Sequence, residues 1–105
     1  MNIIEQNKDK ISALCEKYHV RKLFVFGSVL TDKFTKQSDV DFVVDFEGVK
    51  PDVYDFEFDY ADNYFDLKYS LQGVLNREVD LLEEQAIKNP YLRQSIDASK
   101  MAVYG

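Results

Sequence analysis

The stretch FGSVLTDKFTKQSDVDFVV, residues 26–44, constrains the fold of this chain more than any other segment. An apolar run ends there in Gly27 and Ser28, and a polar turn follows. Asp39 and Asp41 then stand two positions apart at the head of a second apolar run. Because side chains at positions i and i+2 of a β-strand point to the same face, we expect both carboxylates to lie together beside a turn that joins two strands.

The composition indicates one folded domain. A chain of 105 residues is too short for two independent cores, and 46% hydrophobic residues are enough for one packed core. We therefore expect a single domain over residues 1–105. The formal net charge of −6 argues against direct binding to nucleic acid, which requires clustered Lys and Arg.

The cysteine content and the apolar runs favour a cytoplasmic protein. Cys15 is the only cysteine, which excludes an internal disulfide and suits a reducing compartment. It falls at an apolar position of a helical pattern, so we expect a buried side chain rather than a reactive one. The N-terminus does not have the pattern of a signal peptide, and the apolar runs are far shorter than a membrane span.

Hydrophobic periodicity predicts the elements of the first half of the chain. Residues 3–18 have the three- and four-residue apolar spacing of an amphipathic helix, and residues 22–26 form a short β-rich run. Ser28 is in position to cap a short helical turn over residues 29–33. The continuous apolar core of residues 40–45 predicts a central strand covered on both faces.

The second half is predicted to contain a helix, a strand and a further helix. Residues 47–59 fit either an irregular loop or an exposed edge strand, because aromatic and acidic side chains alternate there. Residues 60–75 fit a helix whose apolar stripe includes Phe65, and residues 78–82 fit a third strand. Residues 83–104 fit a helix that breaks near Asn89, before a proline. This order predicts an α/β (α+β) domain with a small mixed sheet and flanking helices.

Asp80 is the candidate third member of a set with Asp39 and Asp41. If its neighbours Val79 and Leu81 face the core, Asp80 faces the opposite side, where an adjacent strand could present Asp41. Carboxylates on one face repel each other, and a divalent cation removes that repulsion. Mg²⁺ takes one or two carboxylates together with substrate phosphates, and a pair of ions stabilises both oxygens of a phosphoryl displacement. The three acids therefore predict a site for Mg²⁺, with two ions.

Gly27 and Ser28 supply the complementary half of such a site. Glycine at the end of a strand lets an anionic ligand approach the backbone closely. The free N–H groups of the following turn, together with the Ser28 hydroxyl, can bind phosphate oxygens. A single loop could then hold a triphosphate while the acids of the strands hold its metal ions.

At this point the chain resembles the minimal nucleotidyltransferases of the DNA polymerase beta superfamily. Their pattern is Gly-Ser, ten residues, then Asp-x-Asp; here Gly27-Ser28 is followed by residues 29–38, which are 38 − 28 = 10 residues, and then by Asp39-Val40-Asp41. The third acid of the family falls on Asp80. The resemblance runs through almost the whole chain and implies a polymerase-beta-like fold.

The resemblance also implies a function and a partner. Gly27 and Ser28 would contact the triphosphate, and Asp39, Asp41 and Asp80 would be catalytic ligands of two Mg²⁺ ions. Small members of the family are antitoxins of HEPN/MNT toxin–antitoxin pairs. The implied reaction transfers AMP from ATP to a hydroxyl, expected to be a tyrosine, of a HEPN-domain ribonuclease toxin, with release of pyrophosphate.

Two alternatives remain open from the sequence. Many members carry Ala-Arg-Gly where this chain has Leu30-Thr31-Asp32, which removes a cation from the phosphate side. The chain could therefore be a catalytically weak binding module that neutralises its toxin sterically. A nucleotidyltransferase that acts on a small molecule or an RNA end is disfavoured by the small size and the negative charge. We also expect residues 54–60, rich in aromatics, to contact the partner.

Overall fold

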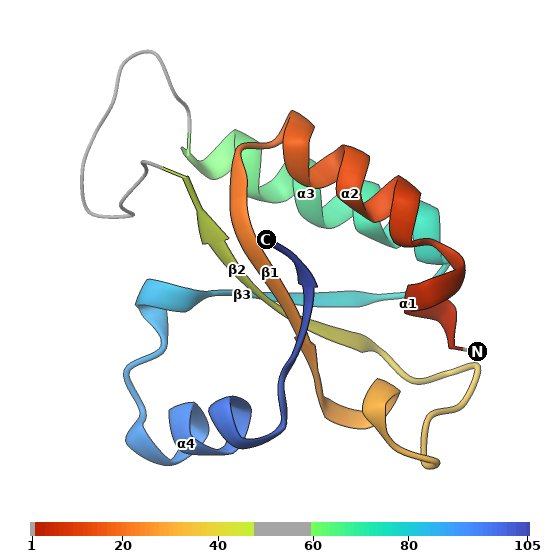
Figure 1. Ribbon diagram of the computed structural model, residues 1–105, viewed down its shortest axis with the longest axis vertical. Coiled ribbons are helices and arrows are strands. Elements are labelled where there is room, and N and C mark those ends of the chain that lie inside the picture. The colour runs from red at the N-terminus through yellow and green to blue at the C-terminus, as the bar shows by residue number, and fades with distance from the viewer. Residues whose placement is uncertain (1, 48–59) are drawn as a thin grey trace.

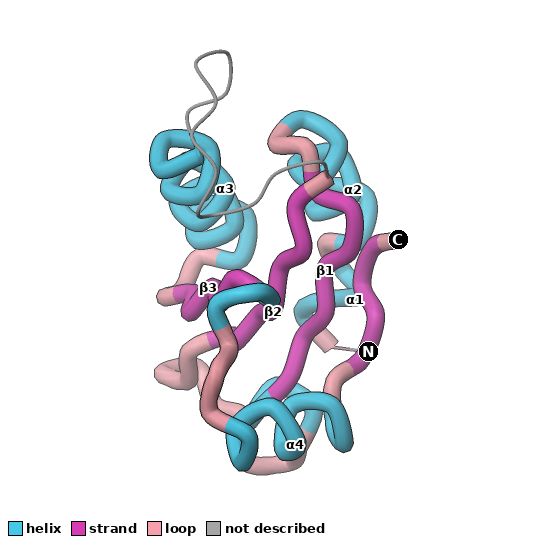
Figure 2. Tube along the Cα trace, turned by 90° about the vertical axis from the view of Figure 1, so that its left-hand side faces the viewer, coloured by secondary structure: helices cyan, strands magenta, loops and turns pink. Residues whose placement is uncertain are grey.

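The computed structural model describes residues 2–47 and 60–105, which form a four-stranded sheet with helices on both sides (Figure 1). Helices α2 and α3 lie together on one side of the sheet, and α4 lies apart from them on the other (Figure 2). The helices are α1 Ile3–Gln6, α2 Lys8–Lys17, α3 Tyr60–Leu75 and α4 Pro90–Ser99, with 3₁₀ turns η1 Gly27–Leu30 and η2 Glu84–Ala86. No helix in the described part of the chain is both long and apolar enough to cross a membrane.

The sheet is mixed, and its strand order is β3-β2-β1-β4. β1 pairs antiparallel with β2 and β4, whereas β2 and β3 are parallel. The parallel pair is joined through the segment that contains α3, as a crossover between parallel strands requires. The strands are β1 Val20–Phe26, β2 Val40–Phe46, β3 Val79–Glu83 and β4 Met101–Tyr104. The prediction of a mixed sheet with flanking helices is therefore confirmed.

β2 is the central strand that its apolar run predicted. Phe42, Val43 and Val44 are all at most 1% exposed, so both faces of this strand are covered. Val44 joins the main core, which α2 and α3 share with the sheet, together with the fully buried Cys15. Burial raises the pKa of the Cys15 thiol to about 12, which keeps it protonated and confirms its predicted core role.

The predicted helix over residues 3–18 is in fact two helices that meet at Asn7. The Oδ1 atom of Asn2 accepts from the backbone N–H of Ile4 and Glu5 and starts α1. Asn7 ends α1, and its side-chain amide donates to the carbonyl oxygen of Ile3. Apolar spacing does not record this break, because the local hydrogen bonds of asparagine compete with the helical ones.

The prediction of one kinked helix over residues 83–104 is wrong. The segment begins as the last residue of β3, passes through η2 and α4, and ends as β4 along β1. Pro90 does not break a helix but occupies the first turn of α4, and the Asn89 side chain caps that turn through the N–H groups of Tyr91 and Leu92. Four residues are too few for periodicity to identify β4.

Two further expectations concern the chain between β2 and α3. Phe65 does not face the core, because 46% of it is exposed. Leu71 and Leu75, which belong to the predicted stripe of α3, are buried as expected, together with Leu67. Residues 48–59, and with them the choice between loop and edge strand, lie outside the described residues. The predicted partner contact at residues 54–60 falls there as well, apart from the backbone of Tyr60.

Candidate active site

The site begins at Gly27, the residue directly after β1, beside Asp41 of β2. The register pairs Phe26 with Asp41, so the turn that follows β1 lies against the head of β2. Gly27 has φ +82°, a conformation that L side chains rarely adopt, and a Cβ atom there would overlap Oδ2 of Asp41. Glycine is therefore required twice at this position, once by the backbone and once by the neighbouring carboxylate.

β3 brings Asp80 beside Asp41, as the sequence predicted. The two residues are register partners in the parallel pair of strands. Val79 and Leu81 are buried, so the strand alternation places Asp80 on the face opposite the main core. Asp39 lies two positions before Asp41, and all three carboxylates are thus at the same end of adjacent strands.

Asp39, Asp41 and Asp80 form no ion pair with any residue that the structure describes. The pKa of Asp41 is raised above its ordinary value, first by burial and then by the charges of Asp80 and Asp39. In the part of the chain that the structure describes, no side chain makes a hydrogen bond or ion pair with any of the three. Such an arrangement is unfavourable alone and is relieved by a bound cation.

A comparison with known families matches the nucleotidyltransferase domain to residues 8–103. The chain belongs to that family.

Similar proteins support this assignment across the length of the nucleotidyltransferase chain. It is 36% identical over 101 residues to a protein of Methanocaldococcus jannaschii that bears the provisional name protein adenylyltransferase, covering 92% of this chain and 94% of the relative. A solved structure, provisionally named a minimal nucleotidyltransferase, is 25% identical with a TM-score of 0.72 and covers 96% of this chain and 95% of its own. The predicted resemblance and the predicted enzyme class are thereby confirmed.

Another solved structure has the same fold at lower identity. It contains a tri-AMPylated HEPN toxin of Shewanella oneidensis in complex with an MNT antitoxin. The match has 20% identity and a TM-score of 0.63, and it covers 97% of this chain and 72% of the other. At that identity it establishes the common fold of the two nucleotidyltransferase chains.

The residues of the nucleotidyltransferase fit a Mg²⁺ ion that is completed by substrate. Among residues 2–47 and 60–105, no three His, Cys, Asp or Glu side chains converge closely enough to hold a metal ion on their own. Asp41 and Asp80 are adjacent, and the pKa of Asp41 is raised by burial and by the charge of Asp80. This pair still matches the usual Mg²⁺ site of one or two carboxylates plus phosphate oxygens and water.

Ser28 lies inside the turn η1 rather than at its cap. Phe26 occupies the cap position, so the expected N-cap role of Ser28 is wrong, and the turn starts two residues earlier than predicted. The Ser28 carbonyl oxygen accepts from the Thr31 backbone and from Thr31 Oγ1, each at 2.9 Å. Its hydroxyl has no partner among the described residues and remains available for a ligand.

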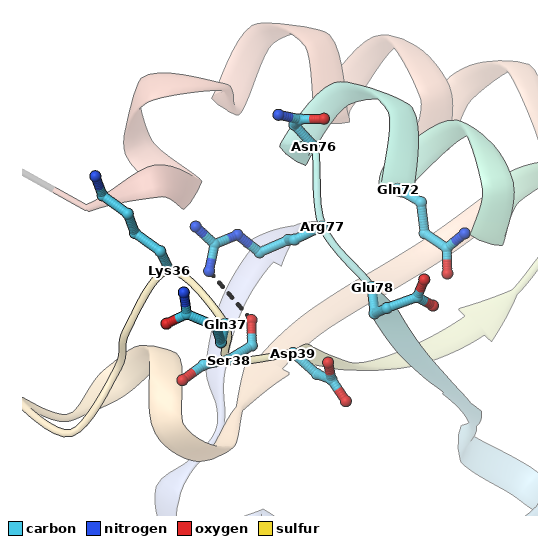
Figure 3. A pocket seen from close by; sticks show the side chains of 8 residues that line it. All are labelled: Lys36, Gln37, Ser38, Asp39, Gln72, Asn76, Arg77 and Glu78. Carbon is cyan, nitrogen blue, oxygen red and sulfur yellow. Dashed lines mark hydrogen bonds between the residues drawn. The ribbon is translucent and has the colours of Figure 1, made fainter.

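A hollow of about 500 Å³ adjoins Asp39 (Figure 3). It is lined by Lys36, Gln37, Ser38, Asp39, Gln72, Asn76, Arg77 and Glu78. The sequence analysis did not identify the cations Lys36 and Arg77 as part of the site. The only local signal for Arg77 is a positive charge three residues before Asp80, which by itself indicates nothing.

Proposed function

We propose that this nucleotidyltransferase transfers AMP from ATP to a hydroxyl group, expected to be a tyrosine, on a HEPN-domain toxin, and thereby acts as its antitoxin. The single observation that carries the proposal is the alignment of Gly27, Asp41 and Asp80 across three adjacent strands. The similar fold that was solved with an AMPylated HEPN toxin supports this choice of partner and modification.

The strand order supports an in-line displacement. Gly27 and Ser28 lie at the end of β1, Asp41 on β2 and Asp80 on β3. If Gly27 and Ser28 hold the β- and γ-phosphates, pyrophosphate leaves on the β1 side. An in-line attack by the acceptor hydroxyl then comes from the opposite, β3 side, past Asp80. The β3 strand is an edge of the sheet among the described strands, which leaves this approach open to a protein partner.

The chemistry joins one oxygen to phosphorus and releases another. The acceptor hydroxyl oxygen attacks the α-phosphorus of ATP, the bond from that phosphorus to the bridging oxygen of the β-phosphate breaks, and pyrophosphate leaves. In this proposal Asp80 would receive the hydroxyl proton. Ser28 and the N–H groups of η1 hold the phosphates, and Asp39, Asp41 and Asp80 would hold Mg²⁺. When bound, two Mg²⁺ ions would neutralise the charge that develops on the attacking and leaving oxygens.

Labelling of the partner tests this proposal. The chain and a HEPN-domain protein that co-purifies with it are incubated with Mg²⁺ and ATP labelled at the α-phosphate. We expect label on the partner, and we expect Asp41→Asn to lower its initial rate by about 100-fold or more because a charge leaves the metal site. Asp45→Asn, on the same strand and face, is the matched control and should retain transfer. Equal rates for the two variants would contradict the proposed site.

One observation favours a second candidate, a binding module that inhibits its toxin sterically. The segment Leu30-Thr31-Asp32 supplies no cation to the phosphates, and the three acids do not form a complete metal cluster without substrate. Under this alternative, Asp39→Asn combined with Asp41→Asn would still protect cells from the toxin. Loss of protection by a folded double variant would exclude it.

A further inference from the structure

Arg77 lies between the two chain segments that carry the site's acids. It follows Asn76, whose φ of +54° ends α3, and it precedes Asp80 by three residues. Its backbone N–H donates to the carbonyl oxygen of Gln72 at 3.4 Å. The side chain extends from there toward the turn that precedes β2 (Figure 3).

One side chain holds three residues of that turn. Arg77 Nη1 donates to the carbonyl oxygens of Thr35 at 3.0 Å and Ser38 at 3.1 Å. The guanidinium carbon also lies 4.5 Å from the centre of the Phe34 ring, in a cation–π contact. Ser38 is the residue before Asp39, so the arginine fixes the peptide group from which the Asp39 backbone continues.

Asp39 depends on such a support because its own side chain is exposed and makes no hydrogen bond with a described residue. Three hydrogen bonds within the turn join Thr35 and Ser38. The Thr35 N–H donates to the Ser38 hydroxyl, the two hydroxyls bond to each other, and the Ser38 N–H donates to the Thr35 carbonyl oxygen. A backbone bond from Val40 to Glu78 also links it to the β3 side, at 3.1 Å. Arg77 is the side chain that adds to this link.

The arginine is not fully satisfied in this position. Its Nε is buried and has no partner among the described residues. A buried unpaired donor costs on the order of 1–3 kcal/mol, so a guanidinium placed only for stability would be expected to avoid it. Arg77 therefore keeps its two bonds to backbone carbonyls although its Nε stays without a partner among the described residues. Local departures of this kind from the most stable arrangement are found at functional sites.

We propose that Arg77 is a positioning residue: it holds Asp39 at the head of β2, next to the paired Asp41 and Asp80, for metal–nucleotide binding, without contacting substrate itself. The proposal rests on the proposed function in that it takes Asp39 as a metal ligand. Its contacts with backbone carbonyls also mean that Arg77 does not replace the arginine missing from residues 30–32 as a phosphate ligand.

Metal binding without turnover tests this role. Isothermal titration calorimetry measures binding of the Mn²⁺ complex of α,β-methylene-ATP, whose α–β bridge cannot be cleaved. The dissociation constant of this complex, written below as the Kd for Mn²⁺, therefore reports the site without AMP transfer. We expect Arg77→Met, which keeps the apolar stem and removes the donors, to raise the Kd for Mn²⁺ by about tenfold. Arg77→Lys, which can reach one carbonyl, should give an intermediate value.

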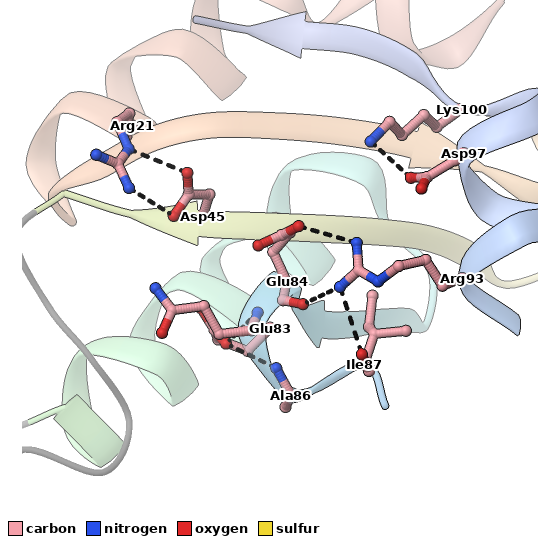
Figure 4. Close-up of polar contacts among 10 residues, drawn as sticks. Arg21, Asp45, Glu83, Glu84, Ala86, Ile87, Arg93, Asp97 and Lys100 are labelled. Carbon is pink, nitrogen blue, oxygen red and sulfur yellow. Dashed lines mark hydrogen bonds and ion pairs between the residues drawn. The ribbon is translucent and has the colours of Figure 1, made fainter. Parts of the chain in front are cut away.

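Arg93 provides a matched control. Its Nη2 donates to the Glu84 carbonyl oxygen at 2.7 Å and its Nη1 pairs with Glu84 Oε1 at 3.0 Å, so it contacts the segment after β3 and not the turn before Asp39 (Figure 4). Arg93→Met should lower the melting temperature and leave the Kd for Mn²⁺ unchanged. If both Arg→Met variants change the Kd equally, or if only the melting temperature changes in Arg77→Met, the positioning role is overturned.

A double-mutant cycle identifies the residue through which Arg77 acts. In an Asp39→Asn background, Arg77→Met should have no further effect on the Kd, because the group that it positions is gone. A full tenfold effect in that background would overturn the proposal. If Arg77→Met does not fold, the cycle is measured with Arg77→Lys, and an unchanged Kd for Arg77→Lys would also overturn the proposal.

The outcomes separate this inference from the proposed function. Mn²⁺ binding without AMP transfer to the partner would contradict the proposed function alone, whereas no Mn²⁺ binding by the wild type would contradict this inference.

Discussion

Asp41 and Asp45 stand on the same face of the same strand, yet their surroundings differ. Asp45 accepts two hydrogen bonds from Arg21, at 3.0 and 3.2 Å, in a bidentate pair (Figure 4). Asp41, four residues earlier, has Asp80 and Asp39 as its charged neighbours and no cationic partner among the described residues. Near one end of β2 a carboxylate forms an ion pair with an arginine, whereas near the other end three carboxylates form no ion pair with any described residue.

The difference shows how a single strand serves both structure and chemistry. A paired carboxylate contributes a little stability and attracts no ligand. An unpaired carboxylate beside two others costs stability in the free protein and makes a cation favourable there. The raised pKa of Asp41 is therefore more informative about function than the ion pair of Asp45.

The largest expected effect comes from filling the space beside Asp41. Gly27→Ala should lower the AMP-transfer rate by about 100-fold or more, because the added Cβ collides with the Asp41 carboxylate and a positive φ disfavours alanine. Gly73→Ala is the control: a Cβ there meets nothing within 4 Å, and it lies inside α3. That variant should gain about 0.5–1 kcal/mol in urea unfolding and keep its rate. An active Gly27→Ala would refute the close approach of Asp41.

A second expected effect concerns Glu83, the buried carboxylate at the end of β3 that lies beside the Asp45 end of β2. Glu83 is 7% exposed, and its Oε2 accepts from the N–H groups of Gln85 and Ala86. Glu83→Ala should cost about 1 kcal/mol in chemical denaturation, because this cap is lost. Glu83→Gln keeps an oxygen that can accept these hydrogen bonds and removes the carboxylate charge. Because burial raises the pKa of the Glu83 carboxyl, that charge is unfavourable in the fold, so Glu83→Gln should lower the unfolding free energy at pH 7 less than Glu83→Ala does. The reverse order of the two variants would show that the charge, not the cap, matters.

The same substitution at the two aspartates should change stability in opposite directions. Asp45→Asn should lower the unfolding free energy at pH 7 by about 0.2–1 kcal/mol, since it removes one partner of an exposed ion pair. Asp41→Asn should raise it, by less than about 1 kcal/mol because the site is partly solvated, as it removes a repelled charge. Both are measured by thermal and urea unfolding without divalent cations. Two changes of the same sign would invalidate the comparison.

The smallest expected effect is the pH dependence of the difference in unfolding free energy between the wild type and Asp41→Asn. A carboxyl whose pKa is raised on folding favours the folded state while it is protonated, and this contribution is lost as pH rises above its ordinary value of 3.8 and through the folded pKa. The wild type should therefore lose stability relative to Asp41→Asn over that rise, in metal-free buffer. Melting curves at stepped pH measure this, and saturating Mg²⁺ with AMP-PNP should reverse the loss in the wild type only.

The pairing of Asp41 with Asp80 was predictable from the sequence because the strand pattern around each residue is local. That Asp39 shares a site with them stays a prediction, since β2 begins one residue later, at Val40. Asp80 was predictable from its apolar neighbours Val79 and Leu81, which become buried on the opposite face. Gly27 was predictable as a turn residue, although the reason that excludes a side chain there, contact with Asp41, appears only in the fold.

The parts that could not be predicted depend on distant segments. Met101–Tyr104 becomes a strand because it pairs with the edge of β1 that β2 leaves free. A pattern of only four residues cannot predict that pairing. Arg77 gains its role from carbonyl groups 39 and 42 residues away in sequence. The break at Asn7 depends on side-chain hydrogen bonds that compete with the apolar pattern over residues 3–18.

The missing Cβ of Gly27 has a consequence for genetics. Because the Asp41 carboxylate fills the space that a side chain would need, an allele that adds a methyl group at residue 27 should be relieved by a smaller side chain at residue 41. Suppressors selected only for a folded, abundant protein should therefore appear at the aspartate, and they should be inactive. Suppressors selected for nucleotide transfer should restore glycine itself, so the two selections separate at this pair of residues.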